Sequence, residues 1–347
     1  MTKNKSVVTL LSKKLYIWGE EMFITRRLPL NIAASDMHLF SHEFNVEAHL
    51  PCVESRYFLY IDLYYFSVAY GLDSYKFPYL RLRKMSLRKL FSHRLRFCSE
   101  TAIVFDDWSA NYFHWMTEVI PRLLYLEDLK INIKINIPTF ILQLPFVRET
   151  INLFNYIHFK ELGINDKTKF FIAKALFCNL KMQSGNYHPE VIKNTSAFFL
   201  KSFNTLSIDS IRIPKRVFIY RNNLNERGIH NFEEIQTLLE YFKIEIVDFG
   251  KLKLKEQVTL MQNCELLVGV HGAGLTNMIF LPQGAKVFEF RRYDDSCNNC
   301  YFSLASACSL SYYYQLCKVD NERIKTQENR FFVDPDKLSA TLNSIFN

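Results

Sequence analysis

The sequence predicts an α/β fold, in which strands and helices alternate over residues 215–292. Three observations support this prediction: short apolar runs typical of buried strands, a helical pattern between two of these runs, and a glycine turn that precedes a further helix. Short, continuous apolar runs are typical of parallel strands that helices cover on both faces. We therefore expect a parallel sheet whose carboxyl-terminal strand ends share one edge, where such sheets bind their ligands.

The predicted elements follow one another in a regular order. Residues 216–221 form a strand that brings Arg221 to its carboxyl end, and a helical pattern runs from Phe232 to Phe242. A second short strand covers residues 244–248, and a third ends at Val270. The last strand of the series covers residues 286–290 and ends near a carboxylate, Glu289.

The glycine turn lies between two of these strands and has the sequence His-Gly-Ala-Gly at 271–274. The helix that follows begins with free backbone N–H groups, which bind anions. Gly272 and Gly274 have no Cβ, so a diphosphate could approach the backbone closely. Glycine spacing alone is also consistent with a plain tight turn between a strand and a helix.

Three polar side chains converge on the same sheet edge if their strands are neighbours. Arg221 would supply positive charge for a phosphate, and Glu289 would accept hydrogen bonds from ribose hydroxyls. His271 stands at the turn between them. Together with the helix start, these residues predict a nucleoside diphosphate site.

A second motif, Asn-Tyr-Phe-His-Trp-Met-Thr-Glu, covers residues 111–118. His114 and Glu118 are four residues apart, so on a helix they share one face and one side chain can orient the other. Such a pair suits proton abstraction from a hydroxyl. In the alternative interpretation, His114 and Trp115 are core residues and Glu118 is an exposed charge. Pro121 is expected to end or kink the helix, and Arg122 to reach a phosphate or solvent.

In these two segments the chain resembles glycosyltransferase family 61. This family includes bacterial capsular polysaccharide enzymes and eukaryotic O-linked N-acetylglucosamine and xylan-modifying transferases. The resemblance rests on residues 111–123 and on residues 268–289 with the strand 216–221 ahead of them, and it covers about residues 100–317.

The resemblance implies a GT-B-like architecture of two Rossmann-like domains facing a cleft. We expect an acceptor-side domain over residues 1–210 and a donor domain over residues 211–347. In such chains the C-terminal helix commonly crosses back to the first domain. The implied activity is inverting transfer from a nucleotide-sugar, UDP-linked by preference, with no metal or other cofactor required. Asp334-Pro335-Asp336 has the spacing of a metal motif but is typical of a helix N-cap followed by proline.

The resemblance also assigns roles to particular residues. It favours Glu118 as the general base, with His114, Asp106 and Asp107 as rivals. Tyr220 departs from the pattern, because relatives often carry Ser there. The donor would be bound by Arg221, Arg227, His271, Gly272, Ala273, Gly274, Leu275, Asn277 and Glu289.

Charge and composition constrain the partners. The chain carries a formal charge of +8, and eight of its basic residues lie between positions 76 and 96 among apolar ones, with no acidic residue between them. This segment suits an anionic membrane surface or an ordinary solvated helix face, and suits a nucleic-acid patch less well. The start of the chain has too short an apolar core for a secretion signal. We expect a cytoplasmic protein, peripheral on the inner face of the membrane, that acts on glycan or lipid-linked acceptors in bacterial capsule or lipopolysaccharide synthesis.

Other functional classes fit less well. The chain has neither a Gly-x-Ser-x-Gly elbow nor a Gly-x-Gly-x-x-Gly turn, which argues against an α/β hydrolase and a nicotinamide enzyme. Cys297 and Cys300 have the spacing of half a zinc site, but Cys308 and Cys317 lie in an apolar pattern typical of core cysteines. The main alternative is a non-catalytic relative that binds carbohydrate or serves as an assembly partner.

Overall fold

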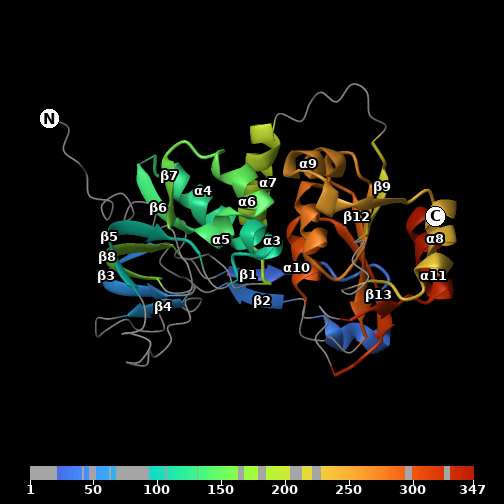
Figure 1. Ribbon diagram of the computed structural model, residues 1–347. Helices are drawn as coiled ribbons and strands as arrows, with labels where there is room; N and C mark the ends of the chain where they lie inside the picture. Colours follow the sequence, from blue (N-terminus) through green and yellow to red (C-terminus); the bar gives the residue numbers. More distant parts are fainter. Residues whose placement is uncertain are drawn as a thin grey trace. The chain divides into compact units, whose positions relative to one another are not determined.

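The computed structural model divides the chain into two compact units, which are described separately (Figure 1). The first unit contains residues 1–23 and 45–183, and the second contains residues 24–44 and 184–347. The structure describes residues 22–40, 43–46, 52–61, 64–67, 94–105, 108–130, 132–162, 168–178, 185–203, 213–220, 228–293, 299–323 and 329–347.

The second unit is built on a six-stranded sheet in which every neighbouring pair is parallel except the last. In this sheet β9 (Arg216–Tyr220), its first strand along the chain, lies between β10 (Glu245–Asp248) and β11 (Leu266–Val270). The connections therefore reverse direction between β9 and β11. In open α/β sheets this switch point is where ligands bind. In spatial order the strands are β10 (Glu245–Asp248), β9 (Arg216–Tyr220), β11 (Leu266–Val270), β12 (Lys286–Arg292), β13 (Ser311–Val319) and β14 (Phe331–Phe332).

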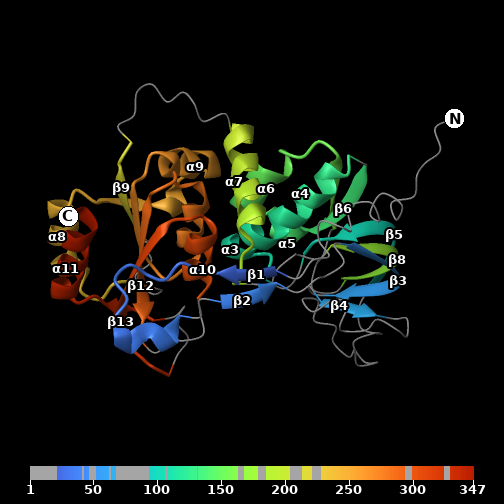
Figure 2. The same ribbon diagram turned by 180° about the vertical axis from the view of Figure 1, so that it is seen from behind.

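Helices cover both faces of this sheet, as the two opposite views show (Figures 1 and 2). On one face lie α8 (Phe232–Tyr241) and α11 (Pro335–Phe346), whose apolar residues pack with Phe218 and Phe288 of the strands. On the other face lie α7 (Pro189–Phe203), α9 (Leu254–Gln262) and α10 (Cys300–Ala307). The predicted alternation of strands and helices over residues 215–292 is confirmed.

The C-terminal helix remains in the second unit. Asp334 caps α11 by accepting hydrogen bonds from the backbone N–H groups of Asp336 and Lys337, and Pro335 begins the helix, as predicted. Leu338 and Leu342 of α11 are fully buried in the same core as α8. The apolar face of α11 is therefore buried within its own unit, whereas the family resemblance led us to consider a helix that crosses back to the first domain.

The predicted boundary near residue 210 also needs correction, because two earlier segments belong to the second unit. Residues 24–44 pack along β13: Leu30 N–H donates to the Tyr312 carbonyl, and Asn31 exchanges hydrogen bonds with the Tyr314 backbone. In α7, the ring of Phe199 packs edge-on against Phe280 at 5.6 Å. These long-range contacts draw both segments into the second unit.

The first unit has a different construction. Its larger sheet has the order β4 (Tyr64–Ser67), β3 (Cys52–Ile61), β8 (Thr168–Cys178), β5 (Arg94–Ile103), with β3 antiparallel to both neighbours. A separate parallel pair joins β6 (Ile133–Pro138) to β7 (Ile157–Leu162). Because the larger sheet mixes antiparallel and parallel pairs, the expectation of a second Rossmann-like domain is not confirmed in the part of this unit that the structure describes.

Short helices and one two-stranded sheet complete the described chain. The sheet pairs β1 (Met22–Thr25) with β2 (Glu43–Val46). No described helix is long and apolar enough to cross a membrane. Most of the basic segment 76–96 lies outside the described residues, and only its last three positions fall in β5. The helices of the first unit are α3 (Tyr112–His114), α4 (Ile120–Asp128), α5 (Thr139–Leu142) and α6 (Pro145–Ile151), with a π-helical segment at Trp115–Val119.

Candidate functional site

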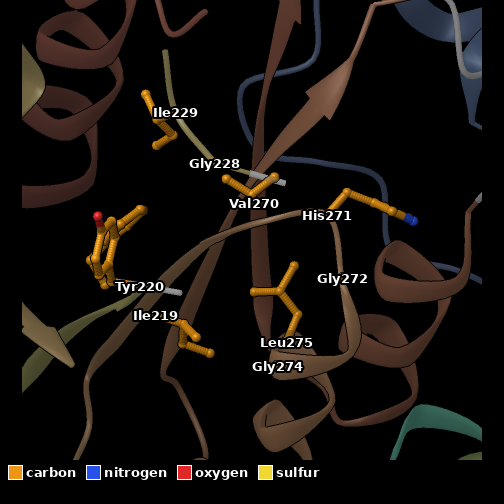
Figure 3. A pocket seen from close by; sticks show the side chains of 10 residues that line it. Ile219, Tyr220, Gly228, Ile229, Val270, His271, Gly272, Gly274 and Leu275 are labelled. Atoms are coloured by element: carbon orange, nitrogen blue, oxygen red, sulfur yellow. The ribbon is translucent and has the colours of Figure 1, made fainter. Parts of the chain in front are cut away.

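A pocket of the second unit lies at the switch point of its sheet (Figure 3). The carboxyl ends of β9 and β11 line it with Ile219, Tyr220 and Val270, and the turn after β11 contributes Gly272, Gly274 and Leu275. The remaining lining residues are Phe218, Gly228, Ile229 and His271. The predicted glycine turn therefore lies where a doubly wound sheet binds its ligand.

The turn leads into η5 (Ala273–Phe280), a 3₁₀ helix rather than an α-helix. At its start, the N–H groups of Ala273 and Gly274 have no hydrogen-bond partner within the described part of the chain, and Leu275 N–H donates to the Gly272 carbonyl. Two backbone donors are thus available beside the pocket, which is the property expected of an anion-binding helix start.

Gly274 allows close packing of η5 against β9. A Cβ at this position would lie 3.1 Å from Cγ2 of Ile219 in β9, closer than an ordinary van der Waals contact. A Cβ on Gly269 would likewise meet Leu275 at 3.1 Å. These glycines let η5 lie directly against the strands, so the backbone donors reach the strand ends.

His271, Glu289 and Tyr312 form a buried network next to this turn. His271 Nδ1 lies 2.5 Å from Glu289 Oε1, and the Tyr312 hydroxyl donates to Glu289 Oε2 at 2.5 Å. Because a carboxylate can only accept, Nδ1 carries the proton. The side chains of His271 and Glu289 are 6% and 1% exposed. The three groups come from the end of β11, from β12 and from β13, which are adjacent strands.

The network stays charged despite its burial. Burial alone would raise the pKa of Glu289, but the charge and hydrogen bond of His271, together with Arg291 and Tyr312, lower it below its ordinary value. Burial and the charge of Glu289 raise the pKa of Tyr312 well above its ordinary value. Glu289 is therefore ionised at neutral pH, and Tyr312 is a neutral donor.

This geometry changes the role expected of Glu289. Both of its oxygens already accept hydrogen bonds, and its side chain is only 1% exposed, so a ribose hydroxyl has little access to the carboxylate. Figure 3 shows the side chain of His271 directed away from Val270 and Ile219. His271 is one of the residues that line the pocket, and its hydrogen bond to Glu289 holds the end of β11 in place. The strand position of Glu289 was predicted correctly, whereas Tyr312 was missed because its contact depends on sheet order.

Several predicted residues lie outside the described part of the chain. They are Arg221, Arg227, Asp106 and Asp107. Asn277, by contrast, is buried in η5, and its amide donates to the Gly274 carbonyl at 3.0 Å. Its contact stabilises the first turn of η5.

In the first unit, His114 and Glu118 form the predicted pair. Asn111 caps the helix by accepting from the N–H of Phe113 at 2.9 Å, and His114 Nδ1 lies 2.8 Å from Glu118 Oε1. The side chain of His114 is 18% exposed and that of Glu118 is 7% exposed. Trp115 is fully buried and donates from Nε1 to Thr150, so the interpretation of Trp115 as a core residue is confirmed.

The sequence also predicted roles for the two residues Pro121 and Arg122. Pro121 does not end the helix: it lies in the first turn of α4, which directly follows the π-helical segment Trp115–Val119 and continues to Asp128. Arg122 does not extend into solvent, because it is 5% exposed and its Nη1 donates to the Val104 carbonyl at 2.8 Å. Arg122 instead joins α4 to the end of β5.

The His114 pair has the geometry of an oriented base. The proton on Nδ1 faces the Glu118 carboxylate, which leaves Nε2 as the acceptor atom of the ring. A histidine held in one tautomer by a carboxylate can take a proton from a hydroxyl. Of the two residues, His114 is the more accessible, so the geometry favours His114 over Glu118 as the base.

The described residues contain no cluster of three or more His, Cys, Asp or Glu side chains able to hold a metal. Cys317 is buried and Cys308 is partly buried, and burial raises the pKa of the Cys308 thiol to about 12. Cys297 lies outside the described part of the chain.

One protein-family model matches the part of the chain that contains both sites. The family model described as Glycosyltransferase 61 matches residues 112–288, just over half of the chain. The matched range contains the His114 pair and the switch-point pocket, and it ends one residue before Glu289.

Several curated proteins are similar over part of the chain, and each is described as an EGF domain-specific O-linked N-acetylglucosamine transferase. The protein of Xenopus laevis is 30% identical over 143 residues, which cover 40% of this chain and 27% of the relative. That of Gallus gallus is 35% identical over 143 residues, 40% of this chain and 26% of the relative. That of Drosophila melanogaster is 27% identical over 137 residues, which cover 36% of this chain and 26% of the relative. The match therefore spans about a quarter of the length of these relatives.

Proposed function

Because this chain belongs to glycosyltransferase family 61, we propose that it transfers a sugar from a nucleotide-sugar, UDP-linked by preference, to a hydroxyl of a glycan or glycolipid acceptor. The proposed reaction inverts the anomeric carbon in a single displacement and requires no metal. Transfer of a glycosyl group is the activity of the family. The choice of donor, the inversion of the anomeric carbon and the choice of acceptor are what we propose in addition.

The main support for nucleotide-sugar binding is the switch-point pocket. It combines the carboxyl ends of β9 and β11 with two available backbone N–H groups, those of Ala273 and Gly274. A helix start of this kind binds the oxygens of a diphosphate. Arg221 directly follows β9 in the chain and is the residue we expect to add positive charge there.

The proton chemistry is assigned to the first unit. In the proposed step His114 Nε2 takes the proton of the acceptor hydroxyl. The oxygen of that hydroxyl forms a bond to the anomeric carbon of the donor sugar as the bond between this carbon and the diphosphate breaks. Glu118 orients the ring and stabilises the imidazolium that forms. Fixed backbone dipoles and positive side chains would stabilise the departing diphosphate.

The proposed biological setting rests on the curated relatives and on the basic segment 76–96. The curated relatives are described as N-acetylglucosamine transferases, which makes N-acetylglucosamine the first sugar to test. The basic segment 76–96 is consistent with contact to an anionic membrane, where lipid-linked acceptors reside. We accordingly propose a role at the cytoplasmic face of a membrane, in the synthesis of a bacterial capsule or lipopolysaccharide.

The test is mass-spectrometric detection of slow donor hydrolysis across UDP-, GDP-, CMP- and TDP-sugars, with EDTA present throughout. Arg221→Ala should abolish cleavage of the preferred donor. Lys215→Ala is the matched control, because it removes a positive charge just before β9, whose other end leads to Arg221, and its side chain is 72% exposed. Cleavage that needs added Mg²⁺ or Mn²⁺ would contradict metal independence. If no donor is cleaved or bound, the non-catalytic alternative is favoured.

A second variant tests the pocket through a described residue. Gly274→Ala places a methyl group 3.1 Å from Ile219 and should shift the start of η5, lowering donor affinity about tenfold. The double variant Gly274→Ala with Ile219→Ala removes the opposing atoms and should recover most of that affinity. Unchanged affinity in Gly274→Ala, measured by titration calorimetry, would place the donor elsewhere.

A further inference from the structure

Trp108 is the most exposed large apolar side chain among the described residues of the first unit, with 53% of its surface accessible. It lies in a turn closed by a hydrogen bond from Asn111 N–H to its carbonyl at 2.9 Å. Asn111 then caps the helix that carries His114. The indole is thus attached through a short, hydrogen-bonded turn to the residues that form the base pair.

The ring of Trp108 lies beside the ring of His114. Their centroids are 5.6 Å apart and their planes are inclined by 30°. On its other side His114 contacts Phe113 edge-on at 4.9 Å and is held by Glu118. Phe140 and Tyr156, the other exposed apolar side chains described in this unit, have no recorded ring contact with this pair.

An exposed indole next to an oriented histidine suits one class of ligand. A pyranose ring has an apolar face of C–H groups and a rim of hydroxyls. The C–H groups carry partial positive charge and pack on the negative face of an aromatic ring, and the hydroxyls bond to polar groups at its edge. A ring that packs on Trp108 would present its rim toward His114.

We propose that Trp108 is the platform of an acceptor-sugar subsite, on which a pyranose ring stacks so that one of its hydroxyls faces His114. This inference rests on the proposed function and sharpens it: the acceptor is a sugar residue of a glycan rather than the side chain of a protein. The subsite consists of the Trp108 indole, the His114 ring and the Glu118 carboxylate behind it.

Tryptophan fluorescence tests the subsite without turnover. The chain contains three tryptophans, and Trp115 is fully buried, so Trp18→Phe leaves Trp108 as the one exposed indole described. In this background, methyl β-glycosides of glucose, galactose and N-acetylglucosamine should quench or shift the emission in a saturable manner. Sorbitol, which has hydroxyls but no ring, should give no change. Absence of any saturable response to these glycosides and to lactose would overturn the proposal.

Kinetics separate this proposal from the proposed function. With an identified donor and lactose or another glycan as acceptor, Trp108→Ala should raise the acceptor KM about tenfold or more and leave donor affinity unchanged. Trp108→Tyr should recover most of the loss because it keeps an aromatic face, and Tyr156→Ala is the control for loss of an exposed ring. Normal acceptor KM in Trp108→Ala would overturn the subsite and leave the transferase function intact. Transfer to Ser/Thr peptides that is insensitive to Trp108 would overturn it as well.

Discussion

The two histidine–glutamate pairs of this protein use the same atoms in different settings. In both, Nδ1 of the histidine faces Oε1 of the glutamate, at 2.8 Å for His114–Glu118 and 2.5 Å for His271–Glu289. The first pair spans one turn of helix and leaves 18% of His114 exposed. The second joins two neighbouring strands, is almost fully buried, and gains a third partner in Tyr312.

This difference in burial separates two functions. A base must meet its substrate, so the pair of the first unit, whose histidine side chain is 18% exposed, is suited to proton transfer. The buried pair, in which both carboxylate oxygens of Glu289 accept hydrogen bonds, instead holds its strands and the adjoining turn in place. Removal of one partner then leaves buried polar groups unsatisfied, which is costly. Variants of the two pairs should therefore affect different measured quantities.

The largest expected effect belongs to His114. We expect His114→Ala to lower the rate of transfer about 10³-fold, because general base catalysis typically contributes 10²- to 10⁴-fold. Its unfolding transition should stay close to that of the wild type. His158→Ala, an exposed histidine on β7, is the control. Retention of more than a tenth of the rate in His114→Ala would move the base to Glu118 or to one of the aspartates at 106 and 107.

The buried pair should respond in stability. Glu289→Ala leaves the Nδ1–H of His271 and the hydroxyl of Tyr312 without an acceptor, and should lower the free energy of unfolding by about 3–5 kcal/mol. Glu265→Ala is the matched control: its carboxylate is 57% exposed and pairs with Lys215 at 2.7 Å, so its loss should cost less than about 1 kcal/mol. Urea unfolding of both variants makes the comparison. Equal effects would show that Glu289 does not anchor the turn.

A smaller effect isolates the third partner. Tyr312→Phe removes one hydrogen bond to a charged acceptor and should cost about 1.5–3 kcal/mol. Tyr313→Phe is a close control, because the hydroxyl of Tyr313 has no recorded hydrogen bond within the described part of the chain. If the two variants unfold at the same urea concentration, Tyr312 contributes nothing to the network.

The smallest effect is a dependence on pH. The folded pKa of Glu289 lies below its unfolded value, so its contribution to stability is complete above the unfolded pKa and is lost as pH falls through the folded pKa. Unfolding free energy of the wild type should therefore decline below about pH 4.5 more steeply than that of Glu289→Gln. Parallel acid profiles of the two proteins would show that Glu289 is not the group responsible.

Local patterns predicted much of this molecule. The helical spacing of His114 and Glu118 predicted their contact, because residues four apart meet on a helix whatever surrounds it. Apolar runs predicted the strands β9 to β12 of the second unit, and the Asp334 cap was recognised from its own neighbours. Each of these features depends on residues close together in the sequence.

The features that escaped prediction depend on distant partners. Tyr312 meets Glu289 because β12 and β13 are neighbours, and strand order has no local signature. Residues 24–44 join the second unit through contacts with β13 almost 300 positions away. The mixed sheet of the first unit was missed for the same reason, since residues 1–100 contain no motif that predicts which strands pair.

The most direct test of this division of functions is to measure kcat and the free energy of unfolding side by side for Glu118→Gln and Glu289→Gln. The change is identical in the two pairs: a carboxylate becomes an amide of the same size. We predict that Glu118→Gln chiefly lowers kcat, and that Glu289→Gln chiefly lowers the unfolding energy, because it removes the buried charge that accepts from both His271 and Tyr312. The opposite pattern, with kcat lost in Glu289→Gln and stability lost in Glu118→Gln, would contradict the account.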